Sequence, residues 1–452
     1  MKNFNTFIPT FLFFLFLAPY SAFATSNCDQ LENKTPLLRS ALDSHGVAFI
    51  PAGVTWRVDN LIMKDSEVIS GDGTICKSKL ASSSIIVSGT DISIRNLRFS
   101  PQYVSGQPNC DVKLSEGSSD IFIKDNHFSG KSYSAICGAN DSAVGGEEYD
   151  VHSQGVLISG NTFNGYVRPI FLHSVDNISI SNNIIRNTLR DGLRLRENNG
   201  FALITGNQFF NIGDGTTSTH TQDAIDTYWG GNRLVITDNI IRTTQSMGLD
   251  IKGVSPNSDQ GSRSVIIANN HISDTLFSGI VLHGNLNSGE INHTLLVEAN
   301  IIEGATRNRT YPDAAIWVKG MVKYLTIANN HLRSNYARGI TIQTRSGTND
   351  GTVVGVHVTG NSIINNGVES AASSIGLYLN GIQGAIVSNN TIGNDYGIEN
   401  PYSRFGIYAT NIIDGVFSDN ILRCNKISDI TITGENILKS DNLIASIGCS
   451  QP

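Results

Sequence analysis

Short runs of alternating apolar and polar residues recur along most of the chain, and most of them end at an Asn. The run "RLVITDNII" at residues 233–241 is representative, because aliphatic side chains occupy every second position before the Asn. A second short run, such as "GLDIKG" at residues 248–253, follows in each unit. Alternation with a period of two, β-branched residues and Gly or Asn punctuation are typical of β-strands. We therefore predict an all-β chain.

The Asn that ends each alternating run repeats after about residue 90, and from Asn207 onward the spacing is roughly thirty residues. The repeated residues are Asn126, Asn161, Asn183, Asn207, Asn239, Asn270, Asn300, Asn330, Asn361, Asn390 and Asn420. A fixed period of this kind predicts a solenoid, here a single-stranded right-handed parallel β-helix of about eleven or more coils. An Asn at a tight turn can adopt the left-handed conformation and bond to the Asn of the next coil, so we interpret this column as a structural ladder.

The second run of each unit can be aligned on its Gly or Ala, which separates inward from outward positions. The aliphatic residues, such as Leu249 and Ile251, point inward. One outward column then reads Phe171, Arg194, Asp226, Asp250, Val281, Trp317, Thr341 and Tyr378. Its neighbour reads His173, Arg196, Tyr228, Lys252, His283, Lys319, Gln343 and Asn380. We expect both columns to face water, either as a solvated sheet face or, from His173 to Lys319, as a functional site built from ionisable and aromatic groups.

Two pairs of acids stand out in this alignment. Asp226 and Asp250 share an outward column on adjacent coils, so their carboxylates are expected roughly 5 Å apart. Their repulsion requires a shared proton, a bound cation, or neighbouring Arg and Lys side chains. Asp191 and Asp223 form a similar pair one residue before the aligned Gly or Ala, where capping of the backbone is an equally good explanation.

The amino-terminal part of the chain resembles a known family. A predicted helix "TPLLRSALDSH", a strand ending in "IPAG" and the segment "EVISGDGTI" are similar to the amino-terminal cap and first coils of the pectate-lyase-like β-helix superfamily. Together with the repeats, the resemblance covers nearly all of the mature chain. It implies the fold with a cap helix, but the superfamily includes lyases, epimerases, glycoside hydrolases and non-catalytic binders.

A narrower resemblance concerns the acids. Asp191 before its Gly, Asp223 and Asp226 on the next coil, and Lys252 on the coil after look like the calcium carboxylates and the basic lysine of family-nine pectate lyases. In that family the lysine directly follows a "GF" pair, whereas Asp250 occupies that position in this chain. The resemblance implies a calcium site built on such carboxylates, and we predict Asp223, Asp226 and Asp250 as its ligands.

A lyase that acts on an acidic polysaccharide must neutralise the uronate carboxylate, remove the C5 proton and release the 4-linked sugar. A C5-epimerase shares the proton abstraction. If the site uses calcium, Lys252 is the expected base, and in a metal-free site an Arg neutralises the uronate while Tyr or His is the base. The catalytic candidates are Lys252, Arg194, Arg196, Tyr228, His173 and His283. The candidates for substrate binding are Trp229, Trp317 and Lys319.

Two other functions fit some of the same residues. Asp226 and Asp250 could be the acid and nucleophile of a retaining glycoside hydrolase. The chain lacks the adjacent Asp pair and the Gly-His-Gly stretch of polygalacturonases, since "LHGN" replaces the latter. A non-catalytic glycan-binding β-helix would need only the aromatic and basic residues, such as Trp229, Trp317 and Tyr228.

The amino terminus predicts export. A lysine, a run rich in Phe and Leu, and an A-x-A arrangement at residues 22–24 form a secretory signal peptide at residues 1–24, so the protein is expected to be secreted or periplasmic. We assign residues 25–80 to the cap and first coils and residues 81–440 to a β-helix whose surface loops form a glycan cleft. Residues 441–452 are assigned to a carboxy-terminal tail.

Six cysteines in the exported part favour disulfides, although the sequence permits several pairings. Their clustering suggests Cys28 with Cys76, Cys110 with Cys137, and Cys424 with Cys449. The formal net charge of −7 argues against a nucleic acid as partner. After the signal peptide, no apolar segment is long enough to span a bilayer, so we do not expect a membrane as partner. The basic side chains on one face of an acidic protein instead predict an acidic polysaccharide as partner of a monomer.

Overall fold

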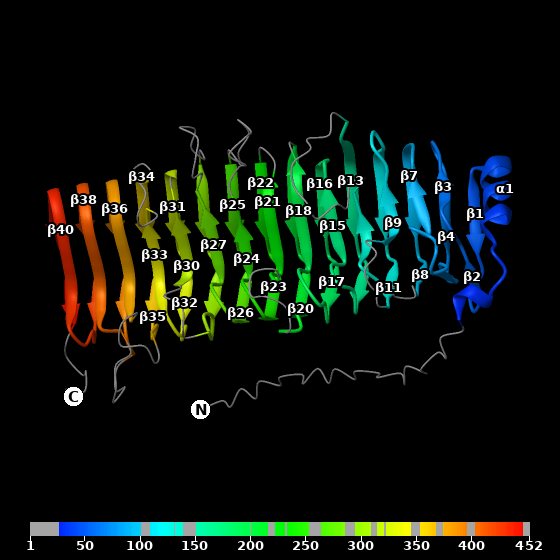
Figure 1. The fold of residues 1–452 in the computed structure, drawn as a ribbon. Coiled ribbons are helices and arrows are strands. Elements are labelled where there is room, and N and C mark those ends of the chain that lie inside the picture. The colour runs from blue at the N-terminus through cyan, green and yellow to red at the C-terminus, as the bar shows by residue number, and fades with distance from the viewer. Residues whose placement is uncertain are drawn as a thin grey trace, which may run out of the picture.

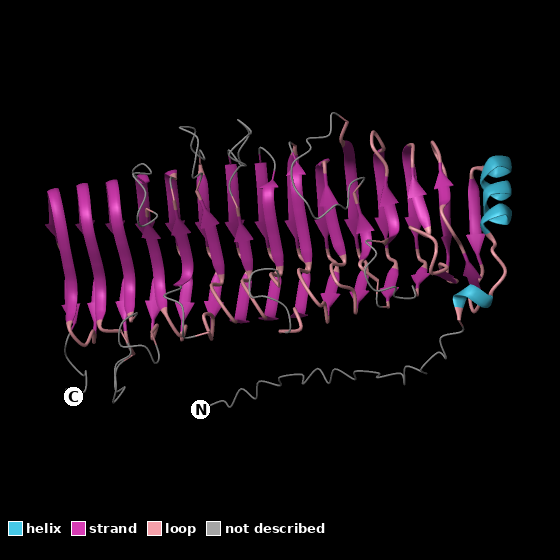
Figure 2. Ribbon diagram, viewed as in Figure 1, coloured by secondary structure: helices cyan, strands magenta, loops and turns pink. Residues whose placement is uncertain are grey.

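The computed structural model describes residues 27–100, 109–130, 132–138, 151–198, 200–215, 222–230, 233–252, 264–284, 294–308, 314–320, 322–344, 353–367, 374–395 and 403–445. These residues form an elongated solenoid in which the strands of successive coils lie side by side (Figures 1 and 2). The pairings between coils are parallel, for example β22 (Arg233–Thr237) with β25 (Ser264–Ala268). The predicted parallel β-helix is confirmed.

A typical coil contributes three strands. In one coil these are β22, β23 (Ile240–Thr244) and β24 (Leu249–Ile251). The middle strand, directly after the ladder Asn, was not distinguished from the sequence. The middle strands form a separate 15-stranded sheet, and the other two stacks merge into one 26-stranded sheet because the long strands β36, β38 and β40 run through both.

The strands group by stack as follows. The 15-stranded sheet holds β2 (Thr55–Arg57), β5 (Thr74–Cys76), β8 (Arg98–Phe99), β11 (His127–Ser129), β14 (Thr162–Asn164), β17 (Ile184–Arg186), β20 (Gln208–Ile212), β23, β26 (His271–Thr275), β29 (Ile301–Glu303), β32 (His331–Arg333), β35 (Ser362–Ile364), β37 (Thr391–Gly393), β39 (Ile421–Arg423) and β41 (Leu443–Ala445). The stack that ends at the ladder holds β1 (Val47–Ile50), β4 (Val68–Gly71), β7 (Thr90–Arg95), β10 (Ser119–Lys124), β13 (Ser153–Ser159), β16 (Val175–Ser181), β19 (Phe201–Thr205), β22, β25, β28 (Leu295–Glu298), β31 (Lys323–Ala328) and β34 (Val353–Thr359). The third stack, here called the site stack, holds β3 (Leu61–Met63), β6 (Ile85–Val87), β9 (Cys110–Leu114), β12 (Ser134–Cys137), β15 (Ile170–His173), β18 (Leu193–Asn198), β21 (Ile225–Gly230), β24, β27 (Ile280–His283), β30 (Ala314–Lys319) and β33 (Arg338–Gln343). The last two stacks are joined by β36 (Ile375–Ser388), β38 (Phe405–Ser418) and β40 (Ser428–Ser440).

The Asn ladder is present and continuous. Asn300 shows the pattern: its Oδ1 accepts from the backbone N–H and the side-chain amide of Asn270 at 3.0 Å, and its own amide donates to the carbonyl of Ile267 at 2.9 Å. The same bonds run from Asn126 to Asn442, one position beyond the predicted column.

The left-handed conformation belongs to the residue before each ladder Asn, which corrects our expectation for the Asn itself. Asp238 and Asn269, for example, have φ values of 57° and 55°. Only Gly, and less readily Asn or Asp, adopts this conformation at low cost, which explains the recurring Gly, Asp or Asn at that position.

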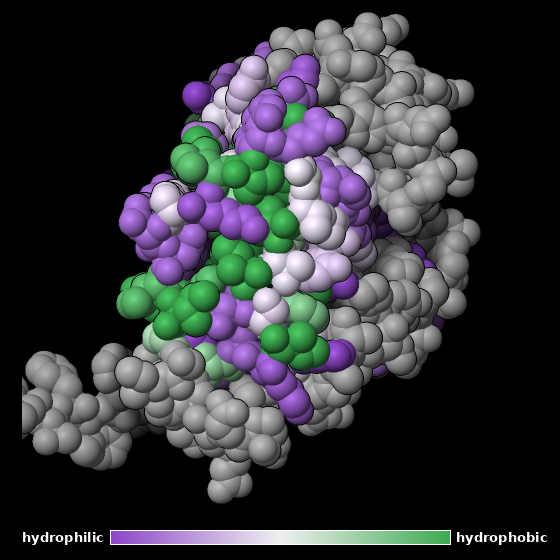
Figure 3. Space-filling view, turned by 90° about the vertical axis from the view of Figure 1, so that its left-hand side faces the viewer, coloured by the Kyte–Doolittle hydropathy of each residue, from purple (hydrophilic) through white to green (hydrophobic). Residues whose placement is uncertain are grey.

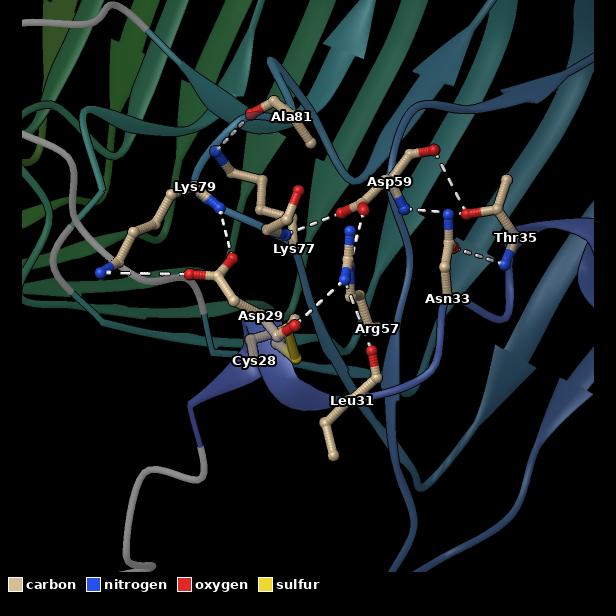
Figure 4. A network of polar contacts seen from close by, with 12 residues as sticks. Cys28, Asp29, Leu31, Asn33, Thr35, Arg57, Asp59, Lys77, Lys79 and Ala81 are labelled. Carbon is tan, nitrogen blue, oxygen red and sulfur yellow. Dashed lines mark hydrogen bonds and ion pairs between the residues drawn. A yellow bond between two sulfur atoms is a disulfide. The ribbon is translucent and has the colours of Figure 1, made fainter.

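A cap covers the amino-terminal end of the solenoid. Helix α1 (Thr35–His45) has Pro36 in its first turn and ends at Gly46 in the left-handed conformation, and it buries Leu38 and Leu42. Figure 4 shows the polar contacts beside it, where Arg57 donates to Asp59 Oδ2 at 2.7 Å. The predicted cap helix is therefore confirmed.

Two of the three predicted disulfides are confirmed, Cys28 with Cys76 and Cys110 with Cys137. Cys424 is also disulfide-bonded, and Cys449, its predicted partner, lies outside the described residues, as does the predicted signal peptide at residues 1–24. In the described part of the chain, no helix is both long enough and apolar enough to span a bilayer.

The carboxy-terminal end differs from the amino-terminal end. Apolar side chains of the last described coil reach the surface there (Figure 3), with Leu438 57% and Ile444 51% exposed. The strands β40 and β41 pair on one side only, with β38 and β39. No described helix covers this end.

The ladder predicts a specific cost of mutation. Asn300→Ala removes the partners of the Asn270 N–H and of the Ile267 carbonyl, both buried, so we expect the free energy of unfolding to fall by about 2–4 kcal/mol. The matched control is Asn164→Ala, because Asn164 accepts one exposed bond from Asn187 and should cost less than about 1 kcal/mol. Urea denaturation followed by circular dichroism measures both, and equal losses would contradict a special role for the ladder.

Candidate functional site

The outward columns predicted from the sequence exist in the site stack. Register pairs Arg194 with Asp226 and Asp226 with Asp250, so the three residues lie in a line on adjacent coils. The neighbouring column pairs His173 with Arg196 and, further along, His283 with Lys319. The alignment on Gly or Ala therefore gave the correct register.

Both columns face away from the coil interior. We expected them to be exposed to water, but much of the first column is buried. Asp226 is 0% exposed, Asp250 is 4% exposed and Arg194 is 8% exposed. A buried carboxylate needs a partner, because loss of hydration is costly for a charge. The site is therefore defined by ion pairs and not by a solvated surface.

Lys252 joins the two stacked carboxylates. Its Nζ lies 2.5 Å from Asp250 Oδ2 and also contacts Asp226 Oδ1. Burial alone would lower the pKa of Lys252, but the charges of Asp226 and Asp250 outweigh it and raise that pKa above its usual value. Lys252 is therefore a fixed cation that relieves the repulsion between the two acids, and this arrangement does not suit it to remove a proton.

A second set of ion pairs lies on the amino-terminal side of Lys252. Arg168 Nε donates to Asp191 Oδ2 at 2.8 Å, and Arg194 NH1 donates to the same oxygen at 3.4 Å. Arg194 Nε lies 3.0 Å from Asp226 Oδ2, close enough for an ion pair although not aligned for a hydrogen bond. Arg194 thus links the two sets.

Arg168 was missed in the sequence, although the alignment contained the signal. The position before the aligned Gly or Ala reads Arg168, Asp191 and Asp223 on consecutive coils, and following that column one coil further back would have included the arginine. Its guanidinium also donates to Tyr133 Oη at 2.6 Å.

Asp191 and Asp223 do cap the backbone. Asp191 Oδ1 accepts from the N–H of Asp223 at 3.2 Å, and Asp223 Oδ1 accepts from the N–H of Met247 at 2.8 Å. Asp223 Oδ2 is buried and accepts no hydrogen bond from the described residues. Burial and then the charge of Asp250 raise the pKa of Asp223 well above its usual value.

The structure groups three carboxylates in a different set from the predicted calcium ligands. Oxygen atoms of Asp191, Asp223 and Asp226 lie within 4.8 Å of one another, and Asp250 is not part of this group. Calcium takes six to eight oxygen ligands. Arg168 and Arg194 already contact Asp191, and Lys252 already contacts Asp226, so these residues as arranged do not offer calcium a shell of oxygen atoms.

The two candidate histidines differ in their surroundings. His283 Nε2 lies 2.7 Å from Asp250 Oδ1, and its side chain is 25% exposed. Burial lowers the pKa of His283, although Asp250 opposes the shift. His173 is more buried, and burial followed by the charge of Arg196 lowers its pKa to about 4. Both imidazoles are therefore neutral near pH 7, and His283 is the more accessible.

The remaining candidates flank these histidines. Arg196 lies over the ring of Phe171, with 5.7 Å from guanidinium carbon to ring centroid. Lys319 Nζ lies 4.1 Å from the ring centroid of Trp317. The backbone of Tyr228 pairs with that of Arg196, and the side chains of Tyr228 and Trp229 lie outside the described residues.

Comparison with known proteins supports the fold. No protein-family model and no curated protein sequence matches the chain. Among solved structures, the tailspike protein of E. coli bacteriophage HK620 in complex with a pentasaccharide has a TM-score of 0.57 at 14% identity, covering 90% of this chain and 75% of the tailspike. The low identity limits this likeness to the fold.

Two further solved structures are similar at lower scores. The catalytic unit of an α-1,3-glucanase from Streptomyces thermodiastaticus has a TM-score of 0.48 at 14% identity, covering 92% of this chain and 66% of that unit. The A-module of a mannuronan C-5 epimerase from Azotobacter vinelandii has a TM-score of 0.36 at 12% identity, covering 92% of this chain and 96% of the module.

The role of Lys252 can be measured through stability. Lys252→Met leaves the buried Asp226 and Asp250 without their shared cation, so the free energy of unfolding at pH 7 should fall by about 3 kcal/mol. The pKa of Asp250 is lower in the folded protein than in the unfolded chain, where it is near 4. Asp250 therefore stabilises the fold at pH values above 4, and this stabilisation is lost at lower pH. The difference between the variant and the natural chain should therefore shrink as pH falls below about 4. Lys124→Met, at an exposed position, is the control, and an equal effect at both positions would refute the bridge.

Proposed function

We propose that the chain is a polysaccharide-active enzyme that removes a proton from an acidic, uronate-containing glycan and cleaves it by β-elimination. The observation that carries the proposal is the contact of His283 Nε2 with Asp250 Oδ1 at 2.7 Å, beside the fixed cation Lys252. A glycan as substrate agrees with the pentasaccharide bound by the tailspike of the same fold.

His283 is the proposed base. With its Nε2–H donating to Asp250, the other ring nitrogen, Nδ1, carries the lone pair that accepts a proton. Asp250 holds the ring in this tautomer and stabilises the imidazolium that forms, as an acid does for a general-base histidine in other enzymes. A lowered pKa keeps the imidazole neutral and ready at neutral pH.

A cation beside His283 supplies the electrostatic part of the reaction. Lys319 pairs with His283 in register, whereas the charge of Lys252 is already shared by Asp226 and Asp250. A uronate carboxylate bound by Lys319 would be neutralised, which makes its C5 proton more acidic. Trp317 beside Lys319 offers an apolar surface to the sugar ring.

The reaction balances without a further reactant. His283 Nδ1 takes the C5 proton, the electrons of the C5–H bond form a C4=C5 double bond, and the C4–O bond breaks. The oxygen of the leaving sugar then takes up one proton, which restores a hydroxyl. A C5-epimerase would use the same abstraction and return a proton to the opposite face of C5.

No step of this proposal is routed through calcium. The oxygen atoms of the predicted ligands Asp226 and Asp250 already contact Lys252, and in this proposal Lys319 supplies the positive charge for the uronate. The same contact weakens the hydrolase alternative. A retaining hydrolase places the scissile bond between its two carboxyl groups, and Lys252 Nζ lies between Asp226 and Asp250.

Product chemistry separates the three functions. We expect purified protein incubated with a panel of polyuronates, including polygalacturonate and alginate, to give both the ultraviolet absorbance of the unsaturated product and new reducing ends. A hydrolase gives reducing ends alone, an epimerase changes the C5 configuration without cleavage, and a binder gives none of these. Activity should survive exhaustive chelation, and loss on chelation with recovery on adding calcium would restore the calcium hypothesis.

The base can be tested by mutation and pH. We expect His283→Ala to lower kcat by a factor of about 10² to 10⁴ while the variant still binds the glycan. In the natural chain kcat/KM should be flat at neutral pH and fall only when pH drops below the lowered pKa of His283. Because Asp250 raises that pKa, Asp250→Asn should move this acid limb to lower pH, and a limb that stays in place would rule out the His283–Asp250 pair as the base.

A further inference from the structure

A second group of aromatic and basic side chains lies on the same outward face, toward the carboxy-terminal end from the site. It consists of Arg338 on β33, Tyr378 on β36, and Phe405 and Tyr408 on β38, and we call it the distal platform. The four residues are partly exposed. In Figure 1 their strands follow β27 and β30 along the solenoid axis.

The rings of the distal platform form one continuous aromatic surface. The rings of Tyr378 and Tyr408 stack with centroids 6.0 Å apart and planes 16° apart. Phe405 meets Tyr408 edge to face with centroids 5.2 Å apart. Partly exposed aromatic rings that are held by one another present a rigid apolar surface, which suits the C–H face of a sugar ring.

Arg338 gives this surface a positive charge. Its guanidinium carbon lies 4.3 Å from the ring centroid of Tyr378. Burial lowers its pKa, and no carboxylate among the described residues forms an ion pair with it. A half-buried arginine without an acidic partner is suited to an external anion, and a carboxylate that it can bind through two N–H groups is a favourable one.

Register connects the distal platform to the candidate site. The outward column continues from Asp250 through Val281, Trp317 and Thr341 to Tyr378 and then Tyr408. Tyr378 lies three coils beyond His283, so their strands are roughly 14 Å apart. One sugar unit of an extended glycan is about as long as one coil is thick, so a glycan that reaches both places has roughly four to five units.

We propose that the distal platform is a second binding subsite for the same acidic polysaccharide, in which the rings stack on one sugar and Arg338 binds a uronate carboxylate. The substrate is therefore a polymer that lies along the solenoid axis, with its reacting unit at His283. The location of the reacting unit rests on the proposed function, whereas the binding at the platform does not.

Affinity as a function of glycan length tests this subsite. Oligouronates from disaccharide to octasaccharide, prepared from polygalacturonate and from alginate, are titrated calorimetrically into the full chain carrying His283→Ala, which prevents turnover. We expect affinity to increase once the oligomer reaches about five units. In that background Tyr408→Ala and Arg338→Gln should each weaken binding of the octasaccharide about tenfold and leave the disaccharide unchanged.

A matched variant separates binding from folding. Tyr324→Ala removes an exposed ring from another strand, β31, and should bind the octasaccharide like the parent. Equal thermal unfolding temperatures confirm that the folds are intact. Affinity that does not depend on length, or an octasaccharide affinity that the platform variants leave unchanged, would overturn the inference, as would failure to bind any oligouronate. Binding with this length dependence in a chain that yields no unsaturated product would overturn the proposed reaction alone.

Discussion

Constant register between parallel coils is the constraint on which the whole molecule depends. Each side chain lies directly beside its counterpart one coil away, so a column must be filled with residues that tolerate their own neighbours. Aliphatic columns gain from this repetition because they pack into one core, and the Asn column gains because each amide is both donor and acceptor. Charged columns lose from it, since like charges are brought together.

In the candidate site, like charges lie next to each other in one column despite their repulsion. Asp226 lies against Asp250, and one ammonium group between them supports both. Folding requires neither acid, since other coils place Thr341 or Tyr378 in the same column. A closely spaced set of charges is thus held rigidly on a sheet, where it needs little rearrangement when a charged substrate binds.

The sequence predicted features that follow from periodicity. Register, the inward core, the ladder and the cysteine pairs whose partners are described could all be read from residue spacing. Contacts that depend on the conformation of a long side chain could not be predicted in this way. Lys252 contacts two acids on different coils, and Arg168 contacts Asp191 from a coil that carried no recognised motif. The middle strands were also missed. Their apolar residues continue the alternating pattern of the preceding strand, and only the bend at the ladder Asn separates the two strands.

The uncapped carboxy-terminal end shows how such a chain can fold. Its last described coil offers unpaired strand edges and apolar residues such as Ile444, and every earlier coil offers the same surface before its successor is laid down. At the other end, helix α1 buries Leu38 and Leu42 and packs beside the first coil (Figure 1). Assembly therefore has a direction, in which α1 and the first coils form the seed and each new coil is a template for the next, in the order in which the chain is synthesised.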